Sequence, residues 1–169
     1  MSQPAVREGQ RATWRRGIVG LALLLLACGA MSGLLAGRAP AASEMPQATV
    51  RLAGQVFHVD VADTIPLQRR GLGGRRALGP AEGMLFPYAE RGYPTFWMLD
   101  MVIPIDIIWI DSTRVVHIEH NVPPPAPGTP AGALPSYRPS QPANAVLEIA
   151  AGRAQALNVR VGSRVEIEY

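Results

Sequence analysis

The amino-acid sequence predicts a mainly β fold, α+β at most: a compact β-sandwich or distorted barrel with two short helices, preceded by an apolar N-terminal helix. Three observations support this prediction. From Thr49 onward, apolar residues alternate with polar ones or form short runs of strand length. Only two segments of this region, 64–71 and 150–157, have the pattern of a helix. Many short strands with so few helices favour a sandwich or barrel over a βαβ fold.

The first 37 residues have the pattern of a signal peptide or membrane anchor. Residues 17–37 contain no charged side chain, and Arg7, Arg11, Arg15 and Arg16 precede them. Translocation machinery recognises a basic flank followed by an apolar run, and it leaves the basic side inside. We therefore expect an exported protein, periplasmic or anchored to the membrane with its domain on the outer face.

Three fates of this segment fit the sequence. Residues 25–28 (LLAC) resemble a bacterial lipobox, in which Cys28 would be lipidated, although the apolar run continues beyond it. Cleavage after the small residues 39–42 is the second. Retention as an anchor is the third, because an apolar helix of this length spans about 31 Å. The Ala- and Pro-rich residues 38–48 then read as a linker to a single β-rich domain, 49–169.

The basic character of the chain belongs to its N-terminal segment. The formal net charge is +3 and the pI is about 9.6, but five of the 16 arginines precede residue 43. Residues 43–169 hold 11 arginines and 12 acidic residues, a net charge of −1, without a basic stripe. We therefore expect no nucleic-acid partner. The only cysteine, Cys28, also precedes the domain, which must depend on its core rather than on a disulfide.

The domain begins with the pattern of a hairpin. Apolar residues alternate with polar ones on both sides of residues 53–55, where Ala-Gly-Gln predicts a turn. Asp63 or Thr64 then offers an N-cap, Pro66 suits the first helical turn, and a short helix is expected to end near Gly71. A glycine-rich connection follows over residues 71–83.

The rest of the domain predicts further short strands. Four are expected over residues 84–86, 94–101, 103–110 and 114–119, with a tight turn at 111–113 between the last two. Residues 121–142 are rich in proline and predict a long loop, a kind of segment that is often functional. A strand over 144–149, the helix over 150–157 and a closing strand over 164–168 complete the chain.

Several short motifs of this domain resemble, in order and spacing, the family called domain of unknown function 192. The matching motifs are GMLF at 83–86, FWM at 96–98, IPIDI at 103–107, ID at 110–111, PSY at 135–137, VLE at 146–148 and AG at 151–152, together with RGL at 70–72 and VG at 161–162. The resemblance covers residues 49–169. It implies a small β-rich domain, often behind a secretion signal, and it implies no activity.

The chain also departs from the family pattern in two places. After Phe-Trp-Met the family commonly has Lys-Asn-Thr, where this chain has Leu99, Asp100 and Met101. The proline-rich loop of many relatives holds cysteines, and this one holds none. Any function that depends on those groups would be changed or lost in this chain.

Acidic residues near the apolar runs are the first candidates for chemistry. Asp106 stands between two isoleucines, where an unpaired carboxylate is costly to bury. In the structural interpretation, Asp106 accepts hydrogen bonds from backbone N–H groups or from an arginine and so fixes the bend after Pro104. Its functional interpretation is an acidic cluster with Asp100 or Glu148, because two carboxylates held about 5 to 10 Å apart can hydrolyse a glycoside.

Aromatic and loop residues are the candidates for binding. Trp97 and Trp109 suit a sugar or peptide platform, although aromatic residues on strands usually fill cores. Tyr137 and Arg138 lie in the proline-rich loop, where they contact a ligand or pin the loop to the sheet.

The sequence predicts neither a metal site nor a cofactor. His117 and Glu119 share one face of the predicted strand, but His120 points away, so only two ligands converge. No Gly-x-Ser-x-Gly elbow and no phosphate-binding glycine motif is present.

Three functions fit these observations. The first is a non-catalytic binding or accessory module at the cell envelope, with a glycan or peptide ligand. The second is an envelope carbohydrate hydrolase using Asp100, Asp106 or Glu148. The third is a membrane-tethered assembly partner.

Overall fold

The structure is a computed structural model that describes residues 45–169. The predicted leader, its apolar helix and Cys28 therefore lie outside the described residues. Neither the length nor the hydrophobicity of a membrane-spanning helix is found among the helices of residues 45–169.

Nine strands, two short α-helices and one 3₁₀ turn make up this part of the chain, which confirms the mainly β prediction. In chain order the elements are β1 (Gln47–Leu52), β2 (Gln55–Val61), α1 (Ile65–Arg70), β3 (Glu82–Gly92), β4 (Phe96–Trp97), β5 (Ile105–Asp111), β6 (Arg114–Val122), η1 (Ala131–Ala133), β7 (Ser136–Tyr137), β8 (Ala143–Ala150), α2 (Arg153–Ala156) and β9 (Val165–Glu168).

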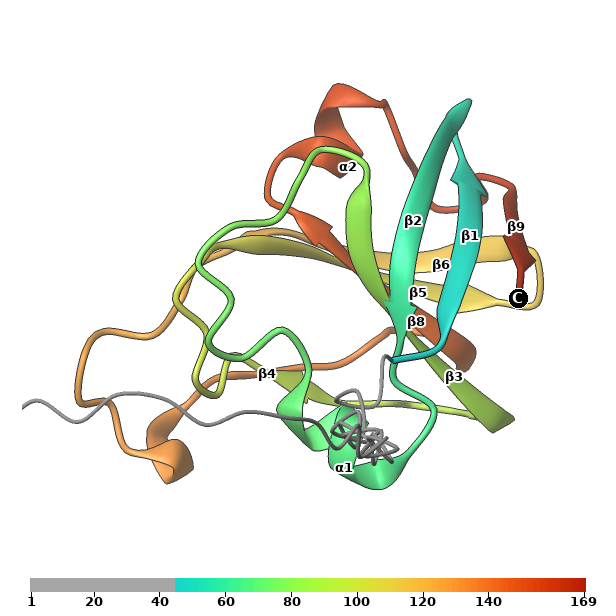
Figure 1. Ribbon diagram of the computed structural model, residues 1–169. Coiled ribbons are helices and arrows are strands. Elements are labelled where there is room, and N and C mark those ends of the chain that lie inside the picture. The colour runs from blue at the N-terminus through green and yellow to red at the C-terminus, as the bar shows by residue number, and fades with distance from the viewer. Residues whose placement is uncertain (1–44) are drawn as a thin grey trace, which may run out of the picture. The chain divides into compact units, whose positions relative to one another are not determined.

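Seven of the strands form one curled sheet, in the order β6-β5-β8-β3-β2-β1-β9 (Figure 1). Only β2 and β3 pair in parallel, and the other neighbours are antiparallel. The two edge strands meet at one end of the sheet, where Val115 N–H donates to the Ser163 carbonyl at 3.0 Å and Val165 N–H donates to the Thr113 carbonyl at 2.9 Å. The sheet is therefore a half-barrel whose edges are protected at that end.

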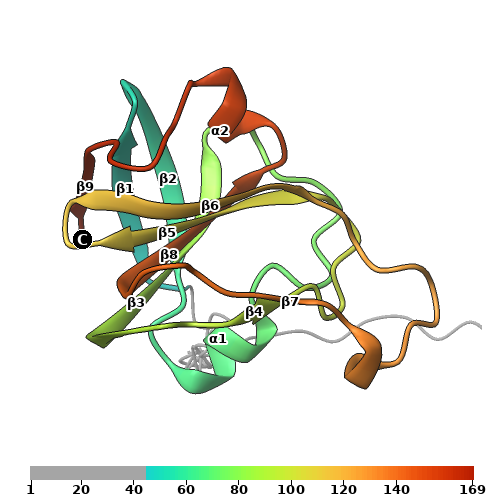
Figure 2. The same ribbon diagram turned by 180° about the vertical axis from the view of Figure 1, so that it is seen from behind.

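A second layer covers the outside of this half-barrel. Strands β4 and β7 pair with each other in a small ribbon that lies beside α1, whereas α2 lies at the opposite end of the domain (Figures 1 and 2). The layers bury two separate apolar clusters. The inner cluster fills the half-barrel and includes Phe57, Leu85 and Ile108. The outer cluster lies between the sheet and the second layer and includes Phe86, Phe96 and Trp109.

Burial on both faces explains the continuous apolar run of β5. Its first six residues are all buried, because odd-numbered side chains join the outer cluster and the isoleucines at 108 and 110 join the inner one. A strand covered on both faces loses the alternation of a half-exposed strand.

The predicted hairpin and both short helices are confirmed. Thr64 caps α1 by accepting from the Leu67 N–H at 3.4 Å, and Pro66 lies in the first turn. The segment predicted as a loop over residues 121–142 contains the end of β6 and the whole of β7. Two further strands differ from the prediction. Strand β3 continues to Gly92, and the strand expected over 94–101 is reduced to two residues, because Met98 and Met101 close a turn and Asp100 has a positive φ of 57°.

Candidate functional site

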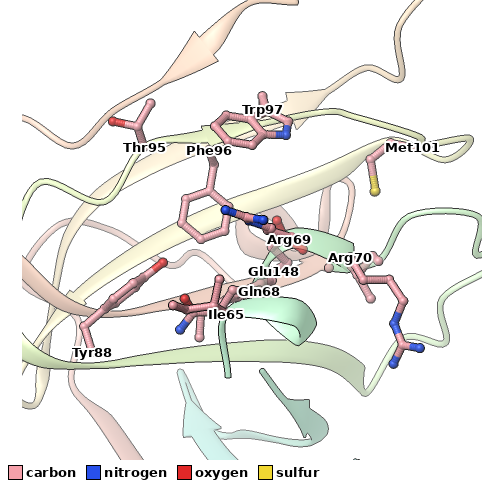
Figure 3. Close-up of a pocket in the computed structure, with 13 residues that line it drawn as sticks. Ile65, Gln68, Arg69, Arg70, Tyr88, Thr95, Phe96, Trp97, Met101 and Glu148 are labelled. Atoms are coloured by element: carbon pink, nitrogen blue, oxygen red, sulfur yellow. The ribbon is translucent and has the colours of Figure 1, made fainter. Parts of the chain in front are cut away.

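A pocket of about 260 Å³ lies between α1 and the outer face of the sheet (Figure 3). Strands β3 and β8 contribute its floor, α1 contributes one wall, and β4 contributes the rim. The residues used below are Ile65, Arg69, Tyr88, Phe96, Trp97 and Glu148.

Glu148 places a carboxyl group at the floor of this pocket. Its neighbours on the adjacent strands are Met84 of β3 and Ile107 of β5, both completely buried. Glu148 itself is only 5% exposed, and its Oε2 atom is buried without a hydrogen-bond partner in residues 45–169. Burial among apolar groups raises the pKa of Glu148 from its ordinary value of 4.5 to about 8. The carboxyl group is therefore mostly protonated at neutral pH, and it can both donate and accept a hydrogen bond.

A close approach of two strands holds Glu148 in place. Gly83 of β3 lies opposite Ile149 of β8, and a Cβ atom on Gly83 would stand only 2.5 Å from the Glu148 carbonyl oxygen. Because any larger residue would push the strands apart, glycine is required at this point of the GMLF motif.

Tyr88 lies on the same face of β3 as Met84 and Phe86, and its hydroxyl points toward the middle of the pocket (Figure 3). Burial, and secondarily the charge that Glu148 would carry, raises the pKa of Tyr88 to about 12. Both groups at the floor are therefore neutral hydrogen-bonding groups at pH 7.

Trp97 forms part of the rim because successive side chains of β4 point alternately into the core and to the surface. Phe96 is buried and packs edge-to-face against Phe86, with ring centroids 4.9 Å apart, whereas the next residue, Trp97, is 51% exposed. Ile65 at the start of α1 is 66% exposed on the opposite side of the pocket. The rim is therefore apolar and partly aromatic.

Two arginines in the last turn of α1 point in different directions. Arg69 extends across the pocket, while Arg70 extends away from it (Figure 3) and donates to the Met45 Sδ atom at 3.2 Å. A positive charge at the C-terminal end of a helix is favourable. Among residues 45–169, Arg69 is therefore the one arginine whose side chain extends across the pocket.

Asp106 has the structural role that the sequence offered as its first interpretation. It lies in β5 and is completely buried. Its Oδ1 accepts from the N–H groups of Asn121 at 2.8 Å and Gly152 at 3.1 Å, and its Oδ2 accepts from the Ala154 N–H at 2.8 Å. Gly152 and Ala154 belong to the N-terminal end of α2, so Asp106 caps that helix from a distant strand.

The three predicted acidic residues are not brought together. Asp106 pairs with Ile149, and Glu148 pairs with Ile107, so their side chains point to opposite faces of the sheet. Asp100 lies in the exposed turn after β4 and lines a different groove, beside the proline-rich loop. No two of these carboxyl groups line one pocket, and the paired geometry of a glycosidase is not formed by them.

The other predicted binding residues are mostly structural. Trp109 is fully buried and donates from Nε1 to the Pro94 carbonyl at 2.9 Å. Tyr137 pairs with Phe96 in the β4–β7 ribbon and packs on the outer cluster, which pins the loop to the sheet. Arg138 stacks on the Tyr93 ring at 4.9 Å from its centroid. Of this group, only Trp97 lines the pocket.

His117 and Glu119 share a face, as predicted, with Nε2 and Oε1 3.1 Å apart. In residues 45–169 no three His, Cys, Asp or Glu side chains converge on a point that could hold a metal ion.

Sequence reasoning missed Arg69 and Tyr88. Tyr88 stands two residues after Phe86 on a strand that was predicted to end at 86, and a longer strand would have placed it on the same face. Arg69 carried no such signal, because only the packing of α1 over the sheet places its side chain at the pocket.

Chemically, the pocket combines neutral hydrogen-bonding groups at its floor, an aromatic surface at its rim and one cation beside them. These are the elements of a binding site for a polar ligand with an apolar face.

Comparisons with known proteins agree with this fold. The model of domain of unknown function 192 (DUF192), described as an uncharacterized ACR, matches residues 48–167. No curated protein matches the chain.

Two solved structures have the same fold, each with a TM-score of 0.64. One, from Sinorhizobium meliloti 1021, is described as a candidate transcription regulator; it is 28% identical over 73% of this chain and 95% of that chain. The other, a protein of unknown function from Novosphingobium aromaticivorans DSM 12444, is 35% identical over 77% of this chain and 94% of that chain. With its motifs, its half-barrel and this family match all in agreement, the chain belongs to the domain of unknown function 192 family.

Proposed function

We propose that this protein is a non-catalytic binding module of the cell envelope, and that the pocket beneath α1 is its ligand site. The observation that carries the proposal is the buried carboxyl group of Glu148: the residue lines an open pocket, and its buried Oε2 has no hydrogen-bond partner in residues 45–169. Leaving such a group unpaired costs about 1 to 3 kcal/mol. A ligand that hydrogen-bonds to Glu148 recovers this loss, and Trp97 supplies a surface for its apolar face.

The envelope location rests on the arginine-flanked apolar segment 17–37. A fusion of the full chain to a reporter that is active only outside the cytoplasm tests the location, and deletion of residues 1–37 should abolish the signal. A reporter that stays active without these residues would contradict it.

The binding function is tested by titrating the full chain with glycan fragments and short peptides while tryptophan fluorescence is recorded. The protein is kept in a detergent without a sugar headgroup, so that the detergent does not compete. We expect a saturable change that is lost in Glu148→Leu and in Trp97→Ala, both of which should remain folded by circular dichroism.

The control for these variants is Glu168→Gln, which removes an exposed carboxylate of β9, outside the pocket. It should bind as well as the unmodified chain. Binding that survives both pocket variants would exclude this site.

A further inference from the structure

The charges around the pocket point to the chemical class of the ligand. Within the described part of the chain, the ionisable residues that line it are Glu148, Tyr88, Arg69 and Arg70. The first two are neutral at pH 7, because burial raises the pKa of both. Arg70 extends away (Figure 3), so among residues 45–169 Arg69 provides the one formal charge that extends across the pocket.

Arg69 is also available to bind a ligand. The ion pairs formed by arginines within residues 45–169 use Arg51, Arg75, Arg91 and Arg164, and none of them uses Arg69. An arginine side chain presents a planar fork of donors that matches a carboxylate with two parallel hydrogen bonds. An anionic group fits this side of the pocket, and an ammonium group does not.

The floor of the pocket requires a part of the ligand that is chemically different from the anionic group at Arg69. A protonated carboxyl and a phenol both donate and accept hydrogen bonds, and hydroxyl groups do the same. A second carboxylate of a ligand would lie in an apolar environment that already keeps Glu148 neutral. The floor therefore suits a hydroxyl.

The rim and the size restrict the ligand further. Trp97 offers a half-exposed aromatic face, on which the C–H face of a saturated ring can pack. The cavity of about 260 Å³ lies below the usual range of roughly 300 to 1,000 Å³ for small-molecule pockets. A single ring fits this space better than an extended chain.

We propose that the pocket binds a sugar acid, free or as one unit of an acidic glycan, with its carboxylate on Arg69, a hydroxyl on Glu148 and its ring against Trp97. This proposal rests on the binding function proposed above and names the ligand class of the same site.

Three probes of the same ring size test the proposal: the methyl glycosides of glucuronic acid, glucose and glucosamine, which are anionic, neutral and cationic. Each is titrated into the full chain at pH 6.5, in a detergent without a sugar headgroup, and the dissociation constant is measured by tryptophan fluorescence. We expect the glucuronide to bind at least 10-fold more tightly than the glucoside, and the glucosaminide to bind most weakly.

Two arginine variants separate the contribution of Arg69 from the charge of the helix. Arg69→Gln should reduce the preference for the glucuronide to less than about twofold. Arg70→Gln makes the same charge change one residue away and should preserve the preference. Equal effects of the two substitutions would overturn the role assigned to Arg69.

Two variants of Glu148 test the floor. Glu148→Gln keeps a donor and an acceptor and should retain glucuronide binding within about threefold, whereas Glu148→Leu should lose the binding of all three probes. A rise in pH from 6.5 to 9 should weaken glucuronide binding several-fold in the unmodified chain, because Glu148 ionises beside Tyr88 while Arg69 and Arg70 stay charged. Glu148→Gln should remove that pH dependence.

The remaining outcomes distinguish this proposal from the more general one. A glucoside that binds as tightly as the glucuronide, or a glucosaminide that binds best, overturns the sugar-acid proposal and leaves the binding module standing. Peptide binding that depends on Glu148 and Trp97 would likewise overturn the sugar-acid proposal and support the binding module. If none of the three glycosides binds, the sugar-acid proposal is rejected, and if no glycan or peptide binds either, the proposed function fails with it.

Discussion

Two carboxyl groups are buried on neighbouring strands of this sheet, one on each face, and the protein holds them in opposite ways. On the inner face, Asp106 accepts three backbone N–H groups and fastens α2 to β5. On the outer face, Glu148 lies among apolar side chains, and its Oε2 has no partner among the described residues. Both are acidic residues within apolar runs of the sequence, yet one stabilises the fold and the other opposes it. Burial alone therefore does not distinguish the two carboxyl groups; their hydrogen-bond partners do.

The largest expected effect is on the inner face. Asp106→Ala leaves three buried N–H groups without an acceptor and should lower the free energy of unfolding by about 3 to 5 kcal/mol, measured by urea denaturation. Asp100→Asn is the matched control, because Asp100 is exposed and Asn tolerates its positive φ; the change should stay within about 0.5 kcal/mol. If Asp106→Ala lowers the free energy of unfolding by less than about 1 kcal/mol, the hydrogen bonds of Asp106 do not stabilise the fold as described.

On the outer face, replacement of the buried carboxyl group of Glu148 is expected to increase the free energy of unfolding rather than lower it. The unfolded chain ionises Glu148 near its ordinary value of 4.5, whereas the folded protein keeps it protonated up to about pH 8. The folded state therefore binds more protons in this range, and its stability falls as the pH rises from about 4.5 through 8. Glu148→Gln stays neutral in both states, so it should match the unmodified chain at pH 4 and be more stable by roughly 2 to 4 kcal/mol at pH 9.

Denaturation of both proteins at several pH values between 4 and 9 measures this difference. Parallel stability curves for Glu148→Gln and the unmodified chain would show that Glu148 is no more protonated in the folded state than in the unfolded one.

The smallest effect on stability is expected for Trp97, which is half exposed. Trp97→Ala should lower the free energy of unfolding by less than about 1 kcal/mol, although it removes the aromatic face proposed to contact the ligand. Trp109→Ala should instead cost about 3 to 5 kcal/mol, because Trp109 is fully buried in the outer cluster. Thermal unfolding of the two variants compares them directly, and similar losses would mean that Trp97 belongs to the core rather than to the rim.

The sequence by itself determined the local elements of the domain. The alternation around residues 53–55 predicted the hairpin, and Thr64 with Pro66 predicted the start of α1, because turns and caps depend on residues that are close in the chain. The motifs also identified the family, and the carboxyl groups at 106 and 148 could be singled out from their apolar neighbours.

Only the tertiary structure decided which of these carboxyl groups has partners. The donors to Asp106 stand 15, 46 and 48 residues away, and no local pattern predicts that they converge. The face of Glu148 depends on the register of β8 against β3 and β5, since a shift by one residue would move it to the inner face. Arg69 joins the site only because α1 packs over that face. The site therefore depends on contacts between distant segments, whereas the elements that carry it could be predicted from neighbouring residues.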